Sequence, residues 1–244
     1  MGLSKKRRRP GKSKAHSIID LRALKPPSTS EGETVVQQYL SVIGNRRSIR
    51  STMSKQVPKA VLRHGISLRT NKGGSLGLDH FRVLYSHEAS VFNSPLKSLL
   101  VSIIRFFAAK AMIGGAFGTL DEFHTNGKLI CWSSTVVKGD TMRAMWFYQH
   151  QTAREQKMNL WYLALVLSLC RVGNMEGVTY LDSGPSYNED SKVAKERMGF
   201  VSTHEWREVC SMDDGDFRYD IPAAQAIPEV VELMAKKIGT GTNT

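Results

Sequence analysis

The sequence has few cysteines, and none are paired at the spacing that metal sites and redox motifs use. Its 244 residues contain three, Cys131, Cys170 and Cys210, all far apart. An odd number without a CxxC pair argues against a small disulfide-stabilised domain and a zinc ribbon. The histidines show neither HxH nor HxxxH spacing, so we expect no metal site. This cysteine usage predicts a reducing, intracellular location, nuclear or cytoplasmic, with a mitochondrial one as the alternative.

The sequence also lacks an apolar run long enough to cross a bilayer. Its most apolar stretch, residues 96–117, is interrupted by Lys97, Arg105 and Lys110, and Leu160–Cys170 has about half the required length. No apolar segment adjoins the charged N-terminus, so no signal peptide is expected. We therefore expect a soluble chain without a membrane partner.

Acidic residues are scarce in the first third of the chain. Through Leu78 there are 17 Lys/Arg and three acids, a charge of +14, whereas the remainder has 17 Lys/Arg and 19 acids, a charge of −2. This asymmetry predicts a basic, largely disordered arm and linker over residues 1–78 and a folded domain over residues 79–244. The arm contains a dense basic cluster formed by Lys5, Lys6, Arg7, Arg8 and Arg9, which would bind RNA or DNA by counterion release. A solvated charged tail is the alternative.

The pattern of apolar residues predicts alternating strands and helices from residue 79 onward, with little core before it. Phe81–Ser86 alternates like a strand. Pro95 begins a helix whose apolar residues recur at helical spacing: Leu96, Leu99, Leu100, Ile103, Ile104 and Phe107. Lys128–Val137 and Thr141–Gln149 flank a glycine-containing turn, which predicts a hairpin.

Further elements follow the hairpin, and one short helix is expected at Val35–Ile43. The later elements are helix Leu160–Arg171, strand Val178–Asp182, helix Ser191–Met198, strands Val201–Val209 and Phe217–Ile221, and helix Pro228–Ile238. The fold class is therefore α/β (α+β), with a mixed, mostly antiparallel sheet flanked by helices.

The loop between the strand that ends at Gln149 and the helix that begins after Asn159 is a candidate anion site. A helix N-terminus presents unpaired N–H groups and the positive end of the helix dipole. Arg154 and Lys157 add positive charge beside it, which would suit a pyrophosphate such as that of coenzyme A. An ordinary solvated loop is the alternative.

Two motifs after this helix carry a family resemblance. They are Leu181-Asp182-Ser183-Gly184 and Lys195-Glu196-Arg197-Met198-Gly199-Phe200. In its order of elements and in these motifs the chain resembles the GNAT superfamily of N-acyltransferases, particularly its Fem-like branch. The resemblance covers about Phe81–Val209 and is tight over Asn159–Phe200. It implies a GNAT-like fold, an acetyl-CoA or other acyl-CoA donor and an amine acceptor.

The chain departs from most of that superfamily at two positions. It has no Arg/Gln-x-x-Gly-x-Gly/Ala run between Gln149 and Asn159, and it has Lys195 where many members have a tyrosine. The Fem-like branch is similar to this chain in both respects. In that branch aminoacyl-tRNA also serves as donor, so the sequence leaves the donor open.

Transfer to an amine requires deprotonation of the amine, polarisation of the acyl carbonyl and protonation of the leaving group. The candidate bases are Glu122 and Asp182, the latter at a strand end. Tyr187 would protonate the leaving group, and Lys195 would hold a phosphate or a leaving oxygen. Asp182 as a turn cap and Lys195 as a solvated surface residue are the alternatives.

The donor is expected to lie along the strand Thr141–Gln149, whose backbone N–H groups would bind the acyl carbonyl. The residues expected to contact it are Met145, Phe147, Gln151, Arg154, Lys157, Asn159 and Asn188.

These observations favour an N-acyltransferase that moves an acyl or aminoacyl group to an amine. The main alternative is a catalytically inactive copy of the fold that binds nucleic acid or belongs to a ribonucleoprotein. A third interpretation is a basic viral or structural protein whose apolar helix, residues 96–112, contacts a membrane or a partner.

Overall fold

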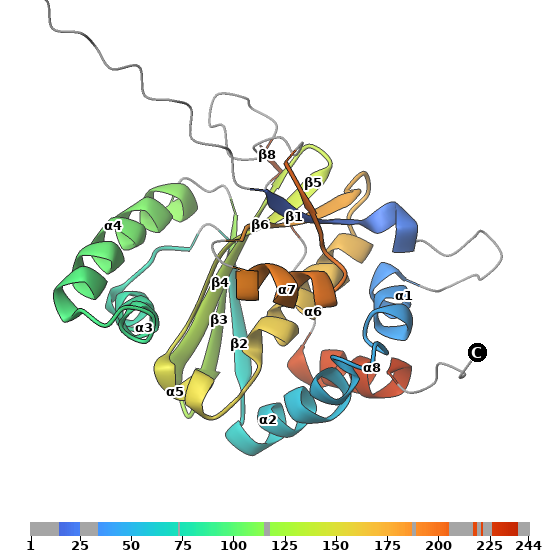
Figure 1. Cartoon of the computed structure of the whole chain (residues 1–244), viewed down its shortest axis with the longest axis horizontal. Helices are drawn as coiled ribbons and strands as arrows, with labels where there is room; N and C mark the ends of the chain where they lie inside the picture. Colours follow the sequence, from blue (N-terminus) through green and yellow to red (C-terminus); the bar gives the residue numbers. More distant parts are fainter. Residues whose placement is uncertain are drawn as a thin grey trace, which may run out of the picture.

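An eight-stranded sheet with helices on both faces forms the centre of the molecule (Figure 1). The structure, a computed structural model, describes residues 15–24, 34–72, 74–114, 118–186, 189–204, 217–218, 221 and 226–238. The mixed, mostly antiparallel sheet flanked by helices that the sequence predicts is confirmed.

The strands are β1 His16–Asp20, β2 Ser67–Lys72, β3 Thr119–Thr125, β4 Lys128–Lys138, β5 Thr141–Gln149, β6 Tyr180–Pro185, β7 Val201–Thr203 and β8 Phe217–Arg218. Their order in the sheet is β2-β3-β4-β5-β6-β1-β7, and β8 pairs with β4. The pairs are antiparallel except for β5 and β6, which run parallel. The parallel pair therefore lies near the middle of the sheet.

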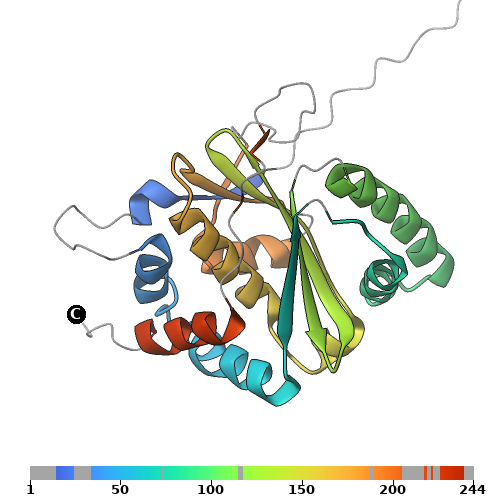
Figure 2. The ribbon, with the colours of Figure 1, turned by 180° about the vertical axis from the view of Figure 1, so that it is seen from behind.

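The helices are α1 Val35–Val42, α2 Val57–His64, α3 Leu78–Ala89, α4 Pro95–Gly114, α5 Gln151–Glu155, α6 Leu160–Gly173, α7 Glu189–Arg197 and α8 Ile227–Lys237, with the 3-10 helix η1 Leu21–Leu24 and the π-helix η2 Thr52–Gln56. Helices α3 and α4 cover one face of the sheet, and α1, α2, α6 and α8 cover the other (Figure 1, Figure 2). None of the helices in the described part of the chain is both long and apolar enough to cross a membrane.

Each face of the sheet has its own apolar core. The larger core joins α1, α2, α6 and α8 to the sheet and includes Tyr39, Leu40, Met53 and Leu163, which are fully buried. The smaller core lies under α3 and α4 and consists of Leu76, Val83, Leu84, Ala109, Ile113, Leu120, Trp132 and Tyr148. The unequal size of the two cores follows from the number of helices on each face.

Several predicted elements are confirmed. They include the helices at α1, α4, α6, α7 and α8, strand β6, and the β4–β5 hairpin. The hairpin turns at Gly139, whose φ of 56° lies in the left-handed region that glycine adopts at little cost.

Two expectations about the first third of the chain are wrong. Order does not begin at residue 79: residues 16–20 form β1, which pairs with β6 and β7, and residues 67–72 form β2. The segment expected to add little core supplies Tyr39, Leu40 and Met53 to the larger core. The apolar residues of this segment are few and lie among many charged ones, so their helical spacing was not recognised in the sequence.

Phe81–Ser86 is not a strand, because it lies inside helix α3. His80, Val83 and Leu84 are buried at helical spacing, and the Gly77 N–H donates to His80 Nδ1 at the start of the helix (3.1 Å). A six-residue window is too short to distinguish a period of two from a period of 3.6.

Candidate functional site

Strands β5 and β6 pair at one end and then separate. Their described pairing consists of Thr141 with Tyr180, Met142 with Leu181 and Arg143 with Asp182. Beyond these positions the edge of β5 no longer faces β6, and a narrow cleft of about 30 Å³ opens between them. The cleft is lined by Ser133, Thr135, Ala144, Trp146, Phe147, Trp161, Ala164, Leu165, Ser168, Leu181, Ser183 and Phe200. Four of these twelve residues are aromatic, so large rings form part of the walls of the cleft.

A tight turn ends β6 beside this cleft. Gly184 has a φ of 72°, and its N–H donates to Asp182 Oδ1 at 2.6 Å. Glycine permits this backbone conformation, and a carboxylate two residues earlier is a usual acceptor for such a turn. The interpretation of Asp182 as a turn cap therefore has a direct structural counterpart.

Asp182 is also the centre of a buried charge network. It has no exposed surface, and its Oδ2 lies 3.0 Å from His16 Nδ1 and 3.4 Å from Arg143 Nε. The three residues come from β6, β1 and β5, so the sheet itself brings them together. Two basic side chains and a backbone N–H thus contact this one buried carboxylate.

Lys195 closes the same turn from helix α7. Its Nζ donates to the backbone carbonyls of Ser183 (3.0 Å), Gly184 (3.0 Å) and Pro185 (3.3 Å). Burial lowers the pKa of Lys195 to about 8, although the nearby Asp182 carboxylate opposes this shift. The alternative of a solvated lysine is excluded, because Lys195 is only 9% exposed.

The pair of His16 and Asp182 fixes the tautomer of the imidazole. An ionised carboxylate can only accept hydrogen bonds, so His16 Nδ1 carries the proton and Nε2 is the basic nitrogen. The His16 side chain is 14% exposed, which leaves it accessible at the edge of the network. This arrangement can orient a general base.

A groove of about 580 Å³ lies at the same edge of the sheet. It is lined by Ala15, Lys192, Glu196, Phe200, Val201, Ser202 and His204. Phe200 also lines the cleft between β5 and β6, so this one side chain forms part of both walls. Ala15, which directly precedes His16 in the chain, is one of the lining residues.

Glu122 is not brought together with the other predicted catalytic residues. It lies on β3, and β4 and β5 separate that strand from β6. Its Oε1 is 2.9 Å from His80 Nε2, and its Oε2 is 3.9 Å from His124 Nε2. These three residues line a separate cavity of about 590 Å³ at the start of α3. Burial lowers the pKa of His80, although the Glu122 carboxylate opposes this shift.

Four of the predicted donor residues lie on β5 or directly before α6. Phe147 lines the cleft, and the strand carries Met145, whose side chain lies outside the described residues. Asn159 begins α6 without a side-chain cap, and Lys157 is exposed two residues before it. The sequence also predicts that Asn159 caps this helix, and that is wrong, because its side-chain amide donates to Gln56 Oε1 (3.3 Å) and to the Lys157 carbonyl (2.8 Å) instead. Donor binding at this helix start stays a prediction.

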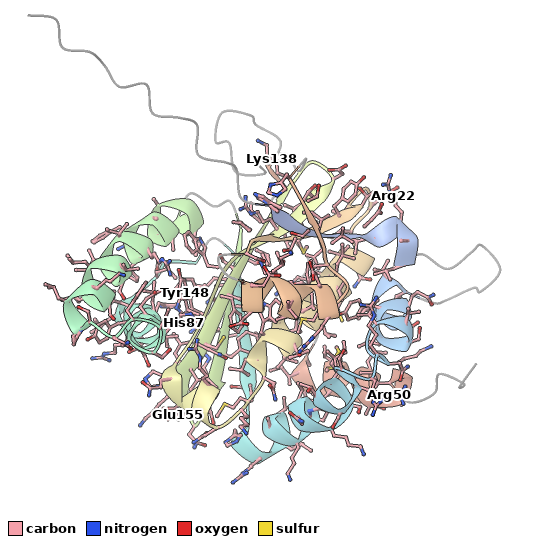
Figure 3. The ribbon with its side chains drawn as sticks, viewed as in Figure 1. Arg22, Arg50, His87, Lys138, Tyr148 and Glu155 are labelled. Carbon is pink, nitrogen blue, oxygen red and sulfur yellow. The ribbon has the colours of Figure 1, made fainter. Side chains whose placement is uncertain are left out.

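Arg154 and Gln151 face α3 instead. Arg154 Nη1 donates to Ser90 Oγ at 2.7 Å, and the Gln151 N–H donates to Ser86 Oγ at 2.9 Å. Figure 3 shows His87 next to Tyr148, and their rings are 5.3 Å apart. Burial and the neighbouring Arg154 lower the pKa of His87 to about 4. The α5 segment is therefore packed against α3, so donor binding by Arg154 and Gln151 stays a prediction.

Some of the predicted site residues lie outside the part of the chain that the structure describes. Tyr187 and Asn188 lie outside the described residues, and so does the basic cluster of residues 5–9. Within the described ranges, no group of three or more His, Cys, Asp or Glu side chains is arranged to hold a metal ion.

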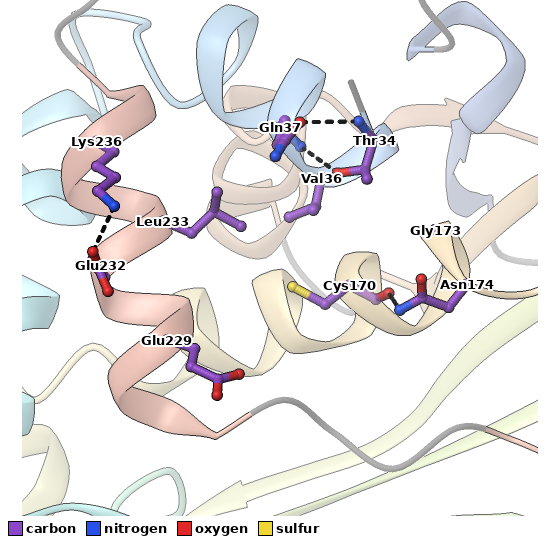
Figure 4. A pocket seen from close by; sticks show the side chains of 10 residues that line it. All are labelled: Thr34, Val36, Gln37, Cys170, Gly173, Asn174, Glu229, Glu232, Leu233 and Lys236. Atoms are coloured by element: carbon purple, nitrogen blue, oxygen red, sulfur yellow. Dashed lines mark hydrogen bonds and ion pairs between the residues drawn. The ribbon is translucent and has the colours of Figure 1, made fainter. Parts of the chain in front are cut away.

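Another hollow, of about 280 Å³, lies where α1 and α8 cross the end of α6 (Figure 4). Thr34 and Gln37 bond to each other's backbone and side chain, and Lys236 pairs with Glu232 at 2.5 Å. Because these lining residues satisfy one another, we place the candidate site at the β5–β6 edge instead.

Sequence reasoning missed His16 and Arg143. His16 lies in a segment that was expected to be disordered, although the following Ser17-Ile18-Ile19 could have indicated a strand. Arg143 lies in a strand that was predicted, but nothing local showed that its side chain would face Asp182. Both omissions come from contacts between residues distant in sequence.

The chain is similar to several solved structures at low sequence identity. A conserved protein of unknown function from Bacteroides thetaiotaomicron VPI-5482 is 12% identical, with a TM-score of 0.51 over 79% of this chain and 58% of its own length. The C-terminal DUF2156 domain of a putative lysylphosphatidylglycerol synthetase from Agrobacterium fabrum is 9% identical, with a TM-score of 0.44 over 78% of this chain and 58% of its own. A tandem GNAT protein from the clavulanic acid biosynthesis pathway is 15% identical, with a TM-score of 0.37 over 78% of this chain and 50% of its own.

These similarities concern the fold alone. The chain spans 58% of the length of the first two of these structures. The two with TM-scores of 0.44 and 0.37 are too distant to support an argument about this chain. No family model matches the chain, and no curated protein matches it.

Proposed function

We propose that the protein is a GNAT-like transferase that moves an acyl or aminoacyl group to an amine. The observation that supports this most is the separation of β5 from β6 beside the buried network of His16, Arg143, Asp182 and Lys195. Strands that part in this way expose backbone N–H and C=O groups to a ligand rather than to a neighbouring strand. The resemblance of Asn159–Phe200 to the Fem-like branch supports the same class of reaction.

His16 acts as the general base in this proposal, and Asp182 positions it. The acceptor ammonium loses a proton to His16 Nε2, and the resulting amine attacks the acyl carbonyl carbon. The C–N bond forms as the bond from carbon to the leaving sulfur or oxygen breaks. The His16 imidazolium gives this proton to the leaving group, and the second proton that the nitrogen loses as the amide forms passes to solvent, so charge and protons balance. Asp182 stabilises the imidazolium, as a carboxylate does when it accepts from Nδ1–H.

The donor carbonyl binds in the cleft. The free edge of β5 after Arg143 provides backbone N–H groups there. Trp146 Nε1 adds a donor, because it is buried without a hydrogen-bond partner among the described residues. Since an unmade buried hydrogen bond costs ~1–3 kcal/mol, a bound carbonyl would relieve that cost. Phe200 and Trp161 must move to widen the cleft for the donor.

Lys195 holds the turn that carries Asp182 and Gly184. Its three carbonyl contacts direct the ammonium at the backbone, so it acts as a positioning residue in the conformation described here. The N-terminus of α6 with Lys157 and Asn159 accommodates the donor phosphates, with Arg154 beside it. The donor is acetyl-CoA, another acyl-CoA or an aminoacyl ester.

The chemical role of His16 can be tested with His16→Asn. The asparagine amide still donates to Asp182, so the network survives, but the basic Nε2 is lost. We expect the transfer rate to fall by roughly 10²–10⁴-fold and the acid limb of its pH profile to disappear. His64→Gln, at the end of α2, is the matched control and leaves the rate unchanged. An unaltered pH profile in His16→Asn would exclude His16 as the base.

Donor binding can be tested without knowledge of the acceptor. Acetyl-CoA at about 100 times its Kd would stabilise the protein by ~2.7 kcal/mol and raise its Tm. The catalytically inactive, nucleic-acid-binding alternative is favoured by the narrow cleft. The nucleic-acid-binding alternative would be supported if acetyl-CoA and CoA leave the Tm unchanged while RNA raises it at low salt but not at high salt.

A further inference from the structure

Helices α3 and α4 expose most of the large apolar side chains found on the surface. Of eleven such exposed side chains in the described ranges, eight lie on α3, α4 and the segment between them. Leu78 and Val91 are two of these, and α4 contributes six: Leu96, Leu99, Leu100, Ile103, Ile104 and Phe107. We call these eight residues the α3–α4 apolar surface. Single exposed apolar residues are ordinary, but a contiguous group of this kind usually marks an interaction site.

Helix α4 exposes large apolar side chains although part of its length packs on the smaller core. Its buried side includes Ser98 and Ser102, and their hydroxyls donate to backbone carbonyls of the helix itself, at 3.0 Å to Ser94 and 2.6 Å to Ser98. The exposed side carries Ile104 at 68% and Phe107 at 63% exposure. An amphipathic helix normally turns its apolar stripe toward the core. The inner side of α4 also carries Ala109 and Ile113, with half-buried Phe106 against them, while six large apolar side chains face outward.

The charges around this surface are positive. Helix α4 has Lys97, Arg105 and Lys110 and no acidic residue. The two acids of residues 78–114 are Asp79 and Glu88; Asp79 pairs with Arg82, and Glu88 is buried and pairs with Arg105. With four basic residues and two acidic ones, the hairpin has a charge of +2.

This charge pattern favours one occupant over the others. In a symmetric contact between two copies, the lysines of both α4 helices would face the same surface without acids to offset them. An anionic lipid surface matches both the exposed apolar side chains and the positive charge. It accepts apolar side chains at the acyl boundary and attracts Lys and Arg at the headgroups.

We propose that the α3–α4 apolar surface binds an anionic membrane, with α4 lying parallel to the membrane plane. A helix of 20 residues at ~1.5 Å per residue presents ~30 Å of contact length. Helix α4 lies at the outer margin of the molecule in both opposite views (Figure 1, Figure 2). The surface is on the face of the sheet away from the larger core, and the inference does not depend on the transferase proposal. The preferred interpretation of the sequence had no membrane partner, whereas its third interpretation had residues 96–112 contact a membrane or a partner; this inference takes up the membrane contact of that third interpretation.

The test is co-sedimentation of the full chain with phosphatidylcholine vesicles that contain or lack phosphatidylglycerol. We expect binding to the anionic vesicles and weaker binding to the neutral ones. The variant Leu100→Asn, Ile104→Asn, Phe107→Asn should lower the partition coefficient by at least roughly tenfold, because three apolar side chains no longer enter the interface. Leu62→Asn is the matched control, since Leu62 is 80% exposed on α2 and should not alter binding.

The basic cluster at residues 5–9 must be separated from this surface. A variant with Gln at Lys5, Lys6, Arg7, Arg8 and Arg9 should keep vesicle binding that is still sensitive to the three α4 substitutions. An unchanged Tm shows that the α4 variant is folded, as expected for exposed positions.

Three results would overturn the proposal. The first is no wild-type binding to anionic vesicles, and the second is equal binding by wild type and the α4 variant. The third is a wild-type dimer in sedimentation velocity that becomes a monomer in the α4 variant, because a second copy would then be the occupant.

Discussion

Helices α6 and α4 are the two most apolar helices of the chain, yet they have opposite environments. Ten of the 14 residues of α6 are buried between the sheet and α1, α2 and α8. Helix α4 packs against α3 and leaves six large apolar side chains exposed. Apolar content therefore does not determine burial; the number of neighbouring elements that the topology provides does.

The two helices also differ in how they treat polar groups. Helix α6 buries Arg171, whose Nη1 and Nη2 each lie 2.6 Å from the Asp121 carboxylate, and Nη2 also reaches Thr70 Oγ1 at 3.2 Å. Helix α4 buries two serines that bond to backbone carbonyls and keeps its lysines at the surface. A buried charge is tolerated only where a partner is built beside it.

The largest loss of stability that tests this difference between α6 and α4 is expected at Arg171. Arg171→Met leaves the Asp121 carboxylate buried without its cation and should lower the free energy of unfolding by ~3–5 kcal/mol. Urea denaturation measures this. Arg171→Met combined with Asp121→Leu should recover much of the loss, because both charges are then absent. A single variant as stable as wild type would show that the pair is not needed.

A direct comparison of the two helices uses equal truncations. Leu163→Ala in α6 removes a fully buried side chain and should cost ~2–5 kcal/mol. Ile104→Ala in α4 removes a side chain that is 68% exposed, and the change should stay within ~0.5 kcal/mol. Chemical denaturation of both variants in one buffer checks this. Equal losses would mean that α4 is covered in solution, by a second copy for instance.

A further expected effect concerns a buried cation that is held mainly by backbone carbonyls. The pKa of Lys195 is about 8 in the folded state, below its ordinary value of 10.5. Between those values the unfolded chain binds more protons, so the free energy of unfolding rises with pH by at most ~1.4 kcal/mol per unit. Lys195→Met should lack this rise, whereas Lys192→Met, a 40% exposed lysine on the same helix, should keep it. Stability curves at pH 7 to 10 measure the difference, and identical slopes would argue against burial of the Lys195 charge.

The parts of the fold that the sequence predicted are those with strong local signals. Helix α6 has an uninterrupted apolar run, the β4–β5 hairpin has a glycine at its turn, and α4 has a proline at its start. Helix α3 and strands β1 and β2 were missed because short or highly charged segments have no clear period. The two strands form only by pairing with β3, β6 and β7, which are distant in sequence.

In the candidate site, too, the residues that lie in local sequence motifs were predicted and those that depend on distant contacts were not. Asp182 and Lys195 lie in local motifs, and the structure brings them to one turn. Glu122 was expected beside them, but the strand order places it elsewhere. His16 could be recognised only after the sheet was known, because its partner follows 166 residues later.

Strand β1 has a consequence for how the chain acquires its final form. Ile18 is paired with Asp182 on one side and with Val201 on the other. The first described strand can therefore join the sheet only after the chain has been synthesised beyond residue 201. Closing so long a loop is entropically slow, and the network around Asp182 stays incomplete until it happens. Removal of residues 15–20, or a bulky fusion directly ahead of them, would leave β6 and β7 without the strand that joins them.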